Sequence, residues 1–180
     1  VLKSLEPDIS PVWSPDGRRL AFATGHLPFR RGELALNIVA ADGTGILNTL
    51  KCPGDYCEPT DWSADGSSLL ISVLDAGIWN VWSISTDPAG GAAPLLTSET
   101  NARDARFSPD GRWVAYVSEE GGRPEVRVHT VSGPARRYVV SGEGGTQRGL
   151  FTEAFHIGRP EEHKQKTWHE DGPSRDRRTQ

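Results

Sequence analysis

The sequence Pro11-Val12-Trp13-Ser14-Pro15-Asp16-Gly17 recurs twice in this chain of 180 residues. The second copy is Thr60-Asp61-Trp62-Ser63-Ala64-Asp65-Gly66, and the third is Ala105-Arg106-Phe107-Ser108-Pro109-Asp110-Gly111. The aromatic residues of successive copies are 49 and 45 residues apart. An internal repeat at a nearly fixed period indicates that one structural unit is used several times.

Each motif is followed by a segment in which large and smaller residues alternate, at 20–23, 69–72 and 114–117. This period of two is typical of a β-strand. Third strands are expected at 37–40, 80–83 and 125–128, and weaker fourth strands at 46–50, 93–96 and 137–140. Four strands in about 45 residues are typical of one propeller blade. The sequence therefore predicts an all-β fold, a β-propeller fragment of about three four-stranded blades at about residues 6–50, 58–97 and 102–141.

The motif itself has the chemistry of a tight turn. In Ser14-Pro15-Asp16-Gly17, proline presets its φ near −65°, and glycine accepts a positive φ at the end of the turn. We expect the preceding aromatic residue to fill the gap between adjacent blades. Because Asp16, Asp65 and Asp110 occupy equivalent turns of different blades, they are interpreted as turn residues, not as a catalytic or metal-binding cluster.

Charge and hydropathy exclude several classes of partner. The chain has 20 Lys plus Arg and 24 Asp plus Glu, a net charge of −4, and a pI of about 5.7. This balance gives no reason to expect a nucleic acid as partner. No apolar run approaches the roughly 20 residues of a membrane helix, so direct membrane insertion is not expected. The chain starts at Val1 and contains no methionine, from which we expect it to be a piece of a longer polypeptide.

The repeat pattern ends near residue 147, which places a partial propeller at 1–147 and a charged tail at 148–180. The tail has few apolar residues and is predicted to be disordered or to be non-native sequence, such as a frameshifted end. His156, His163 and His169 lie in it and are interpreted as solvated side chains.

The first repeat contains a six-residue insertion around 25–33, which is expected to form a mobile loop. His26 to Gly32 in this loop are candidate contact residues.

The motifs carry a family resemblance. Trp-Ser-Pro-Asp-Gly followed by Arg-Arg-Leu-Ala-Phe, and Phe-Ser-Pro-Asp-Gly followed by Arg-Trp-Val-Ala-Tyr-Val-Ser, resemble repeats of the TolB-type, WD-repeat-like β-propellers. The resemblance covers about residues 1–147. It implies one of three settings: a free-standing periplasmic protein of the Tol-Pal envelope system that binds other proteins, the gating domain of a prolyl oligopeptidase or dipeptidyl peptidase relative, or the extracytoplasmic C-terminal region of a bacterial membrane-bound serine/threonine kinase. Segments 116–126 and 140–147 most resemble the kinase-attached propellers.

Catalytic motifs are absent from the sequence. It contains no Gly-x-Ser-x-Gly nucleophile elbow, no phosphate-binding loop and no kinase catalytic loop. We therefore predict no catalytic residue, no cofactor-binding residue and no metal ligand.

The sequence leaves three alternatives open for Cys52 and Cys57: a local disulfide in an exported protein, two free thiols, or two ligands of a zinc ion. Trp79 and Trp82 are expected to pack between blades, with contact to a partner as the alternative.

The function that fits these observations is a non-catalytic protein-binding or sensory propeller module of a larger bacterial protein. Its expected location is periplasmic or otherwise extracytoplasmic, and its expected partner is a protein or another extracytoplasmic ligand. The alternative is the substrate-gating propeller of a prolyl oligopeptidase-like serine peptidase whose catalytic domain is absent from this chain.

Overall fold

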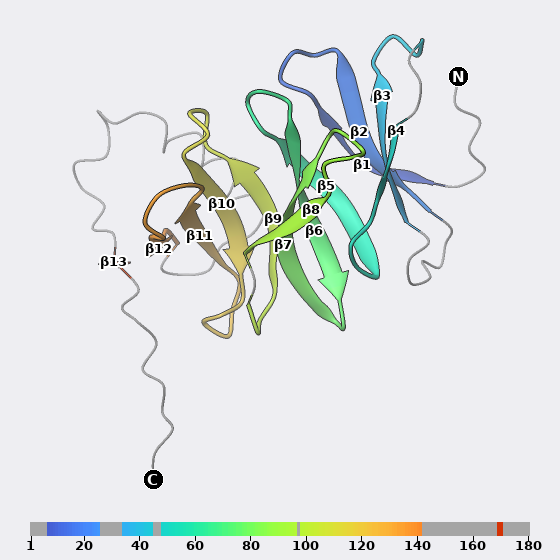
Figure 1. The fold of residues 1–180 in the computed structure, drawn as a ribbon. Coiled ribbons are helices and arrows are strands. Elements are labelled where there is room, and N and C mark those ends of the chain that lie inside the picture. Colours follow the sequence, from blue (N-terminus) through green and yellow to red (C-terminus); the bar gives the residue numbers. More distant parts are fainter. Residues whose placement is uncertain (1–6, 26–33, 45–47, 97, 142–168, 171–180) are drawn as a thin grey trace.

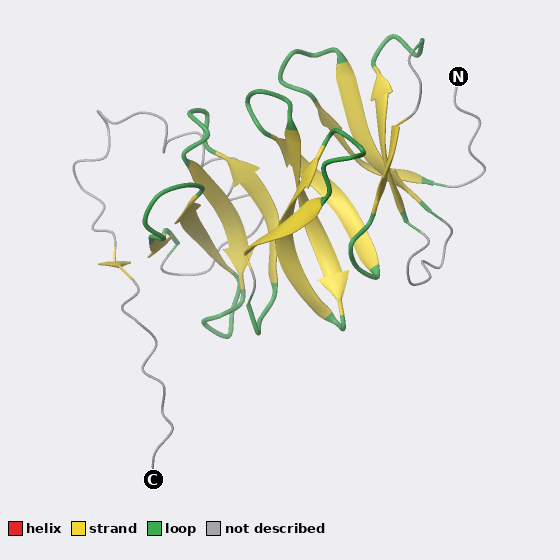
Figure 2. Ribbon diagram, viewed as in Figure 1, coloured by secondary structure: helices red, strands yellow, loops and turns green. Residues whose placement is uncertain are grey.

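The computed structural model describes residues 7–25, 34–44, 48–96, 98–141 and 169–170. These ranges form three antiparallel sheets stacked side by side and contain no helix (Figures 1 and 2). The all-β propeller architecture predicted from the sequence is thus confirmed. The insertion at 26–33, most of the tail at 142–168 and 171–180, and with it His156 and His163, lie outside the described residues.

Each sheet is a meander whose strands pair in the order of the sequence. The first sheet contains β1 (Asp8–Trp13), β2 (Arg19–Thr24), β3 (Ala35–Ala40) and β4 (Asn48–Lys51). The second contains β5 (Tyr56–Trp62), β6 (Ser68–Asp75), β7 (Ile78–Ser85) and β8 (Ala92–Leu96). The third contains β9 (Ala102–Phe107), β10 (Trp113–Ser118), β11 (Glu125–Thr130) and β12 (Arg137–Val139), and β13 (His169–Glu170) pairs with β12 at its edge.

The strands expected from the sequence are present, with small shifts at the fourth position. The strand expected at 46–50 is β4, which runs from Asn48 to Lys51, and residues 45–47 lie outside the described part. The strand expected at 137–140 ends at Val139. Strand β1 contacts β5, and β5 contacts β9. The first strands of the three sheets therefore lie next to one another, as the innermost strands of a propeller do around its axis.

Side-chain hydrogen bonds close each hairpin turn. In the first repeat the Ser14 hydroxyl donates to the Asp16 carboxylate at 2.6 Å and accepts the Arg19 amide N–H at 2.8 Å, and Asp16 also accepts the Arg18 amide N–H at 3.0 Å. The same three bonds recur in the second and third repeats. Gly17, Gly66 and Gly111 have φ values of +68°, +69° and +69°. The turn chemistry predicted from the motif is confirmed.

The hydrophobic core lies between the sheets in layers. One layer joins the first and second sheets and includes Trp62, which is 3% exposed. A second layer joins the second and third sheets, and Phe107 packs against it. These two aromatic residues pack between adjacent sheets, as expected. Trp13 does not, because it lies on the face of the first sheet turned away from the second and is 62% exposed.

Replacing Gly111 with valine will destabilise the protein, because φ of +69° is unfavourable for a β-branched residue. The left-handed conformation costs about 1–2 kcal/mol for a residue with a Cβ, and urea unfolding will measure the loss. A Cβ at Gly111 meets no atom within 4 Å, so the effect isolates the backbone conformation. Gly111→Asn is the matched control, since asparagine tolerates positive φ. Equal stability of the valine variant and the parent would contradict the turn assignment.

Candidate functional site

Polar and aromatic side chains of all three sheets form a connected group toward the end of the sheets opposite the motif turns. This end carries the β6–β7 and β10–β11 turns and the connections between sheets. We call the group the three-sheet network and define it by Ser10, Tyr56, Glu58, Trp79, Asn101, Arg103 and Glu119. Every member is partly exposed. The network therefore joins several chemical types on one accessible surface.

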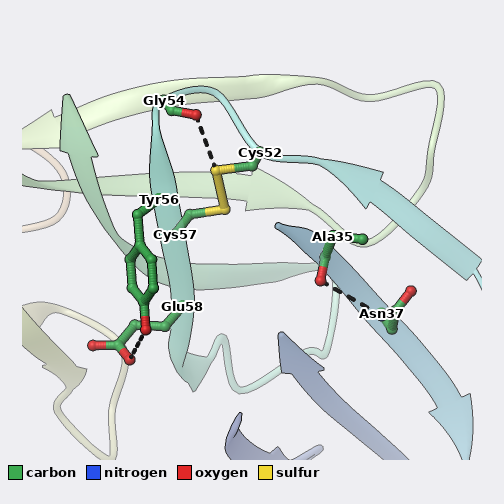
Figure 3. The surroundings of a disulfide bond; sticks show 7 residues. All are labelled: Ala35, Asn37, Cys52, Gly54, Tyr56, Cys57 and Glu58. Carbon is green, nitrogen blue, oxygen red and sulfur yellow. Dashed lines mark hydrogen bonds between the residues drawn. A yellow bond between two sulfur atoms is a disulfide. The ribbon is translucent and has the colours of Figure 1, made fainter. Parts of the chain in front are cut away.

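Glu58 on β5 connects the first two sheets. Its carboxylate accepts a hydrogen bond from the Ser10 hydroxyl at 2.7 Å and from the Tyr56 hydroxyl at 3.5 Å; Figure 3 shows the second contact. Burial, together with the neighbouring negative charge of Glu58, raises the pKa of Tyr56 to about 12. The phenol is therefore protonated at neutral pH and remains a donor.

Trp79 connects the second sheet to the third. Its ring meets the Tyr56 ring edge to face, with centroids 5.4 Å apart and an interplanar angle of 81°. Its backbone N–H donates to the Asn101 side-chain oxygen at 3.1 Å, and the Asn101 amide donates to Glu119 at 2.7 Å. Arg103 lies 4.0 Å from Glu119 and completes the network.

A strained bulge lies next to Arg103 in β9. Asp104 has φ of +58°, its backbone N–H donates to the Ser72 hydroxyl at 3.0 Å, and its carboxylate lies 3.5 Å from Arg103. Burial raises the pKa of Asp104, although Arg103 and Arg106 oppose this shift. Ser10 occupies the equivalent bulge of β1 with φ of +53°. These bulges are located in the innermost strands, where they re-aim the backbone toward neighbouring sheets.

A disulfide links Cys52, just after β4, to Cys57 in β5 (Figure 3). The two Cα atoms are 5.9 Å apart, and the residues are 8% and 0% exposed. The bond belongs to the core layer between the first two sheets. Of the three alternatives for these cysteines, the structure thus contains the disulfide. It also restrains the start of β5, where Tyr56 and Glu58 of the network lie.

The recurring aspartates of the motif do not come together. Asp16, Asp65 and Asp110 lie in separate turns, and hydrogen bonds from serine hydroxyls and backbone N–H groups lower the pKa of each. In the part of the chain that the structure describes, no group of three or more His, Cys, Asp or Glu side chains is arranged to hold a metal ion. The interpretation of these aspartates as turn residues fits this geometry.

The tryptophans singled out from the sequence differ in their surroundings. Trp82 packs against the first core layer, as expected. Trp79 belongs to the three-sheet network. The sequence did not single out Tyr56, Glu58, Asn101 or Arg103, because none belongs to the repeated motif. The one feature of the sequence that could have drawn attention to this network is the position of Tyr56 beside Cys57.

The family model described as the TolB beta propeller domain (PD40) matches residues 1–153 of this chain. The chain belongs to the TolB β-propeller family. It is 32% identical over 137 residues to the uncharacterized peptidase YuxL of Bacillus subtilis, a match that covers 76% of this chain and 18% of YuxL. It is 29% identical over 125 residues to the Tol-Pal system protein TolB of Bordetella pertussis, which covers 69% of this chain and 27% of that protein.

A solved structure shares the fold of this propeller chain. The crystal structure of TolB from Acinetobacter baumannii matches with a TM-score of 0.54 at 24% identity, over 80% of this chain and 32% of that one. The chain thus spans less than a third of each of these three proteins. Within the described residues, no helix has the length and apolar character needed to cross a membrane.

Replacing Asp104 with asparagine will stabilise this propeller at neutral pH. Because burial raises the pKa of Asp104 in the folded state, its carboxylate opposes folding above that pKa and ceases to do so once protonated. The stability advantage of Asp104→Asn is therefore present at pH 7 and shrinks as the pH falls. Thermal melts from pH 7 to pH 3 will measure it. Asparagine also tolerates the positive φ, whereas Asp104→Val, the control, will lower the melting temperature at every pH.

Removing the disulfide with Cys52→Ala and Cys57→Ala together will lower the free energy of unfolding by about 2 kcal/mol. This value follows from the loop-closure entropy of a short loop. Urea unfolding of the double variant, compared with the oxidised parent, will measure the loss. Mass spectrometry provides the control: when the protein is unfolded in urea without reductant, no thiol should react with an alkylating reagent. Two alkylated thiols would show that the bond is absent.

Proposed function

We propose that this TolB-family propeller is a non-catalytic module that binds a protein partner through the three-sheet network. The observation that carries the proposal is the composition of that surface. It combines Tyr56, Trp79 and Arg103, the residue types that are enriched in protein interfaces and their hot spots. Its carboxylates accept hydrogen bonds from Ser10, Tyr56 and Asn101.

The module acts outside the cytoplasm in this proposal. A buried disulfide supports this location, because disulfides persist in oxidising compartments such as the periplasm. The similarity to a Tol-Pal system protein supports it as well. The parent polypeptide is then either a free-standing propeller or a membrane-bound kinase with an extracytoplasmic propeller.

Photo-crosslinking from inside the network tests this function. A photoreactive phenylalanine analogue at Trp79 is expected to crosslink one protein of the bacterial envelope, and the same analogue at Asp42, near the opposite end of the sheets, is expected not to. The captured partner is then titrated against Trp79→Ala and Arg103→Ala. We expect each to weaken binding at least tenfold, a loss of about 1.4 kcal/mol. Thr44→Ala, on an exposed turn, is the control.

Equal crosslinking from Trp79 and Asp42, or unchanged affinity of both network variants, would refute this binding site. The thermal melts of the variants must match that of the parent, so that a loss of binding is not a loss of folding.

A gating propeller of a serine peptidase is the second candidate function. The identity of 32% to a protein named as a peptidase favours it. In that setting the propeller controls access to an active site in another domain, and the network contacts peptide substrates on their way in. Peptide hydrolysis by the full-length parent, abolished by a fluorophosphonate, would support this function over the first.

A further inference from the structure

The repeat presents the same junction between sheets twice, which allows the two to be compared position by position. At the first junction the Arg19 side chain lies between neighbouring turns. Its guanidinium donates to the Gly66 carbonyl at 3.0 Å and lies 4.7 Å from the centroid of the Trp62 ring. A Cβ at Gly66 would lie 2.7 Å from an Arg19 nitrogen, and Gly66 is buried. The arginine therefore occupies the space over Gly66.

Smaller residues occupy the equivalent positions of the second junction. The strand registers align Ser68 with Arg19, Phe107 with Trp62, and Ser83 with Ile38. A cavity of about 350 Å³ opens there, lined by residues that include Ser68, Ser83 and Phe107. Its volume is at the lower end of the range of ligand pockets, about 300–1,000 Å³.

The backbone acceptor that Arg19 uses has an unused counterpart in this cavity. The Gly66 carbonyl accepts hydrogen bonds from Arg19 and from the Thr86 hydroxyl at 3.1 Å. The equivalent carbonyl is that of Gly111, and Val131 stands in the place of Thr86. Among the described residues no hydrogen bond to the Gly111 carbonyl is present. A Cβ at Gly111 would meet no atom within 4 Å. Gly111 itself lines the cavity and is partly exposed, so its backbone borders the space that a ligand would occupy.

The charge of the cavity suits a cation. Asp65 is the one charged side chain among the described residues that line it. Hydrogen bonds from the Ser63 hydroxyl and from the amide and hydroxyl of Ser67 lower the pKa of Asp65 to about 2, so it is ionised at neutral pH. The counterpart Asp110 has a guanidinium partner in Arg112, at 2.6 Å. The residue after Gly66 is Ser67, which carries no charge.

We propose that this cavity is a subsite for the arginine side chain of a partner polypeptide. The guanidinium would donate to the Gly111 carbonyl, face the Asp65 carboxylate, and lie over the Phe107 ring, as Arg19 does over Trp62. This proposal rests on the proposed function in one respect only: both assume that the ligand is a polypeptide. The subsite lies at the end of the sheets opposite the three-sheet network, so each site can fail independently of the other.

Amide NMR of the full chain tests the subsite with the probe peptide acetyl-Gly-Arg-Gly-amide. We expect saturable shifts of the Gly111, Ser68 and Phe107 amides at millimolar peptide. The peptide with citrulline in place of arginine has the same shape but no charge, and we expect it to bind at least fivefold more weakly. Equal binding of both peptides, or no shift at these amides, would overturn the proposal.

Two variants fill the cavity from within. Ser68→Arg places a guanidinium where the first junction has one, and we expect it to abolish the peptide-induced shifts. Ala89→Arg adds the same charge on an exposed loop outside the cavity and should bind as the parent does. Ser83→Ile narrows the cavity without adding charge and should weaken binding several-fold. If Ser68→Arg does not fold, the Ser83→Ile variant alone tests whether the peptide binds in the cavity. If Ser83→Ile and a folded Ser68→Arg both still bind the arginine peptide, the proposal is overturned. Crosslinking from Trp79 tests the three-sheet network separately and should be unaffected by either variant.

Discussion

A short hydrogen bond from a serine hydroxyl to an aspartate carboxylate holds each hairpin turn, and the rest of the fold depends on it. It measures 2.6 Å in all three repeats. The same hydroxyl accepts a backbone N–H five residues later, so one side chain joins the two strands that the turn connects. This fixes the register of the first two strands of each sheet. Because a shift of one residue would exchange the two faces of a strand, the turn also decides which side chains meet the next sheet.

The junctions between sheets follow from that register but differ in what fills them. Arg19, Ile38 and Trp62 fill the first junction, and the Trp62 indole N–H donates to the Val12 carbonyl at 3.1 Å. The second junction has two serines and a phenylalanine at the same positions and retains a cavity. The strand registers of the two junctions are equivalent, and the side chains at these equivalent positions are smaller at the second junction. Function in a repeat fold can arise in this way, by substitution at one junction while the turns are kept.

The sequence predicted the parts of the fold that depend on local chemistry. The strands, the turns and the positive φ of Gly17, Gly66 and Gly111 follow from residues adjacent in the chain. The burial of Trp13 was predicted wrongly, because it requires a neighbouring sheet on a face that no described sheet covers. The three-sheet network escaped prediction because Ser10, Glu58 and Asn101 lie in different sheets and outside the motif. Aligning the repeats shows that Ser68 of the second repeat is equivalent to Arg19 of the first. Only the structure shows the space that the Arg19 side chain occupies.

The turn chemistry also sets the charge of the cavity. Asp65 accepts the hydrogen bonds that close its hairpin, and these lower its pKa further, so the residue that closes the turn also carries a negative charge at the second junction. Residues after the motif glycine decide whether that charge is compensated. They are Arg18 and Arg19 in the first repeat, Arg112 and Trp113 in the third, and Ser67 and Ser68 in the second. Of the three repeats, only the second has no cation at either of these two positions, and its Asp65 lines the cavity. Ser68 in place of Arg19 thus removes both a cation and side-chain volume at the second junction, and an arginine from outside the chain would supply both.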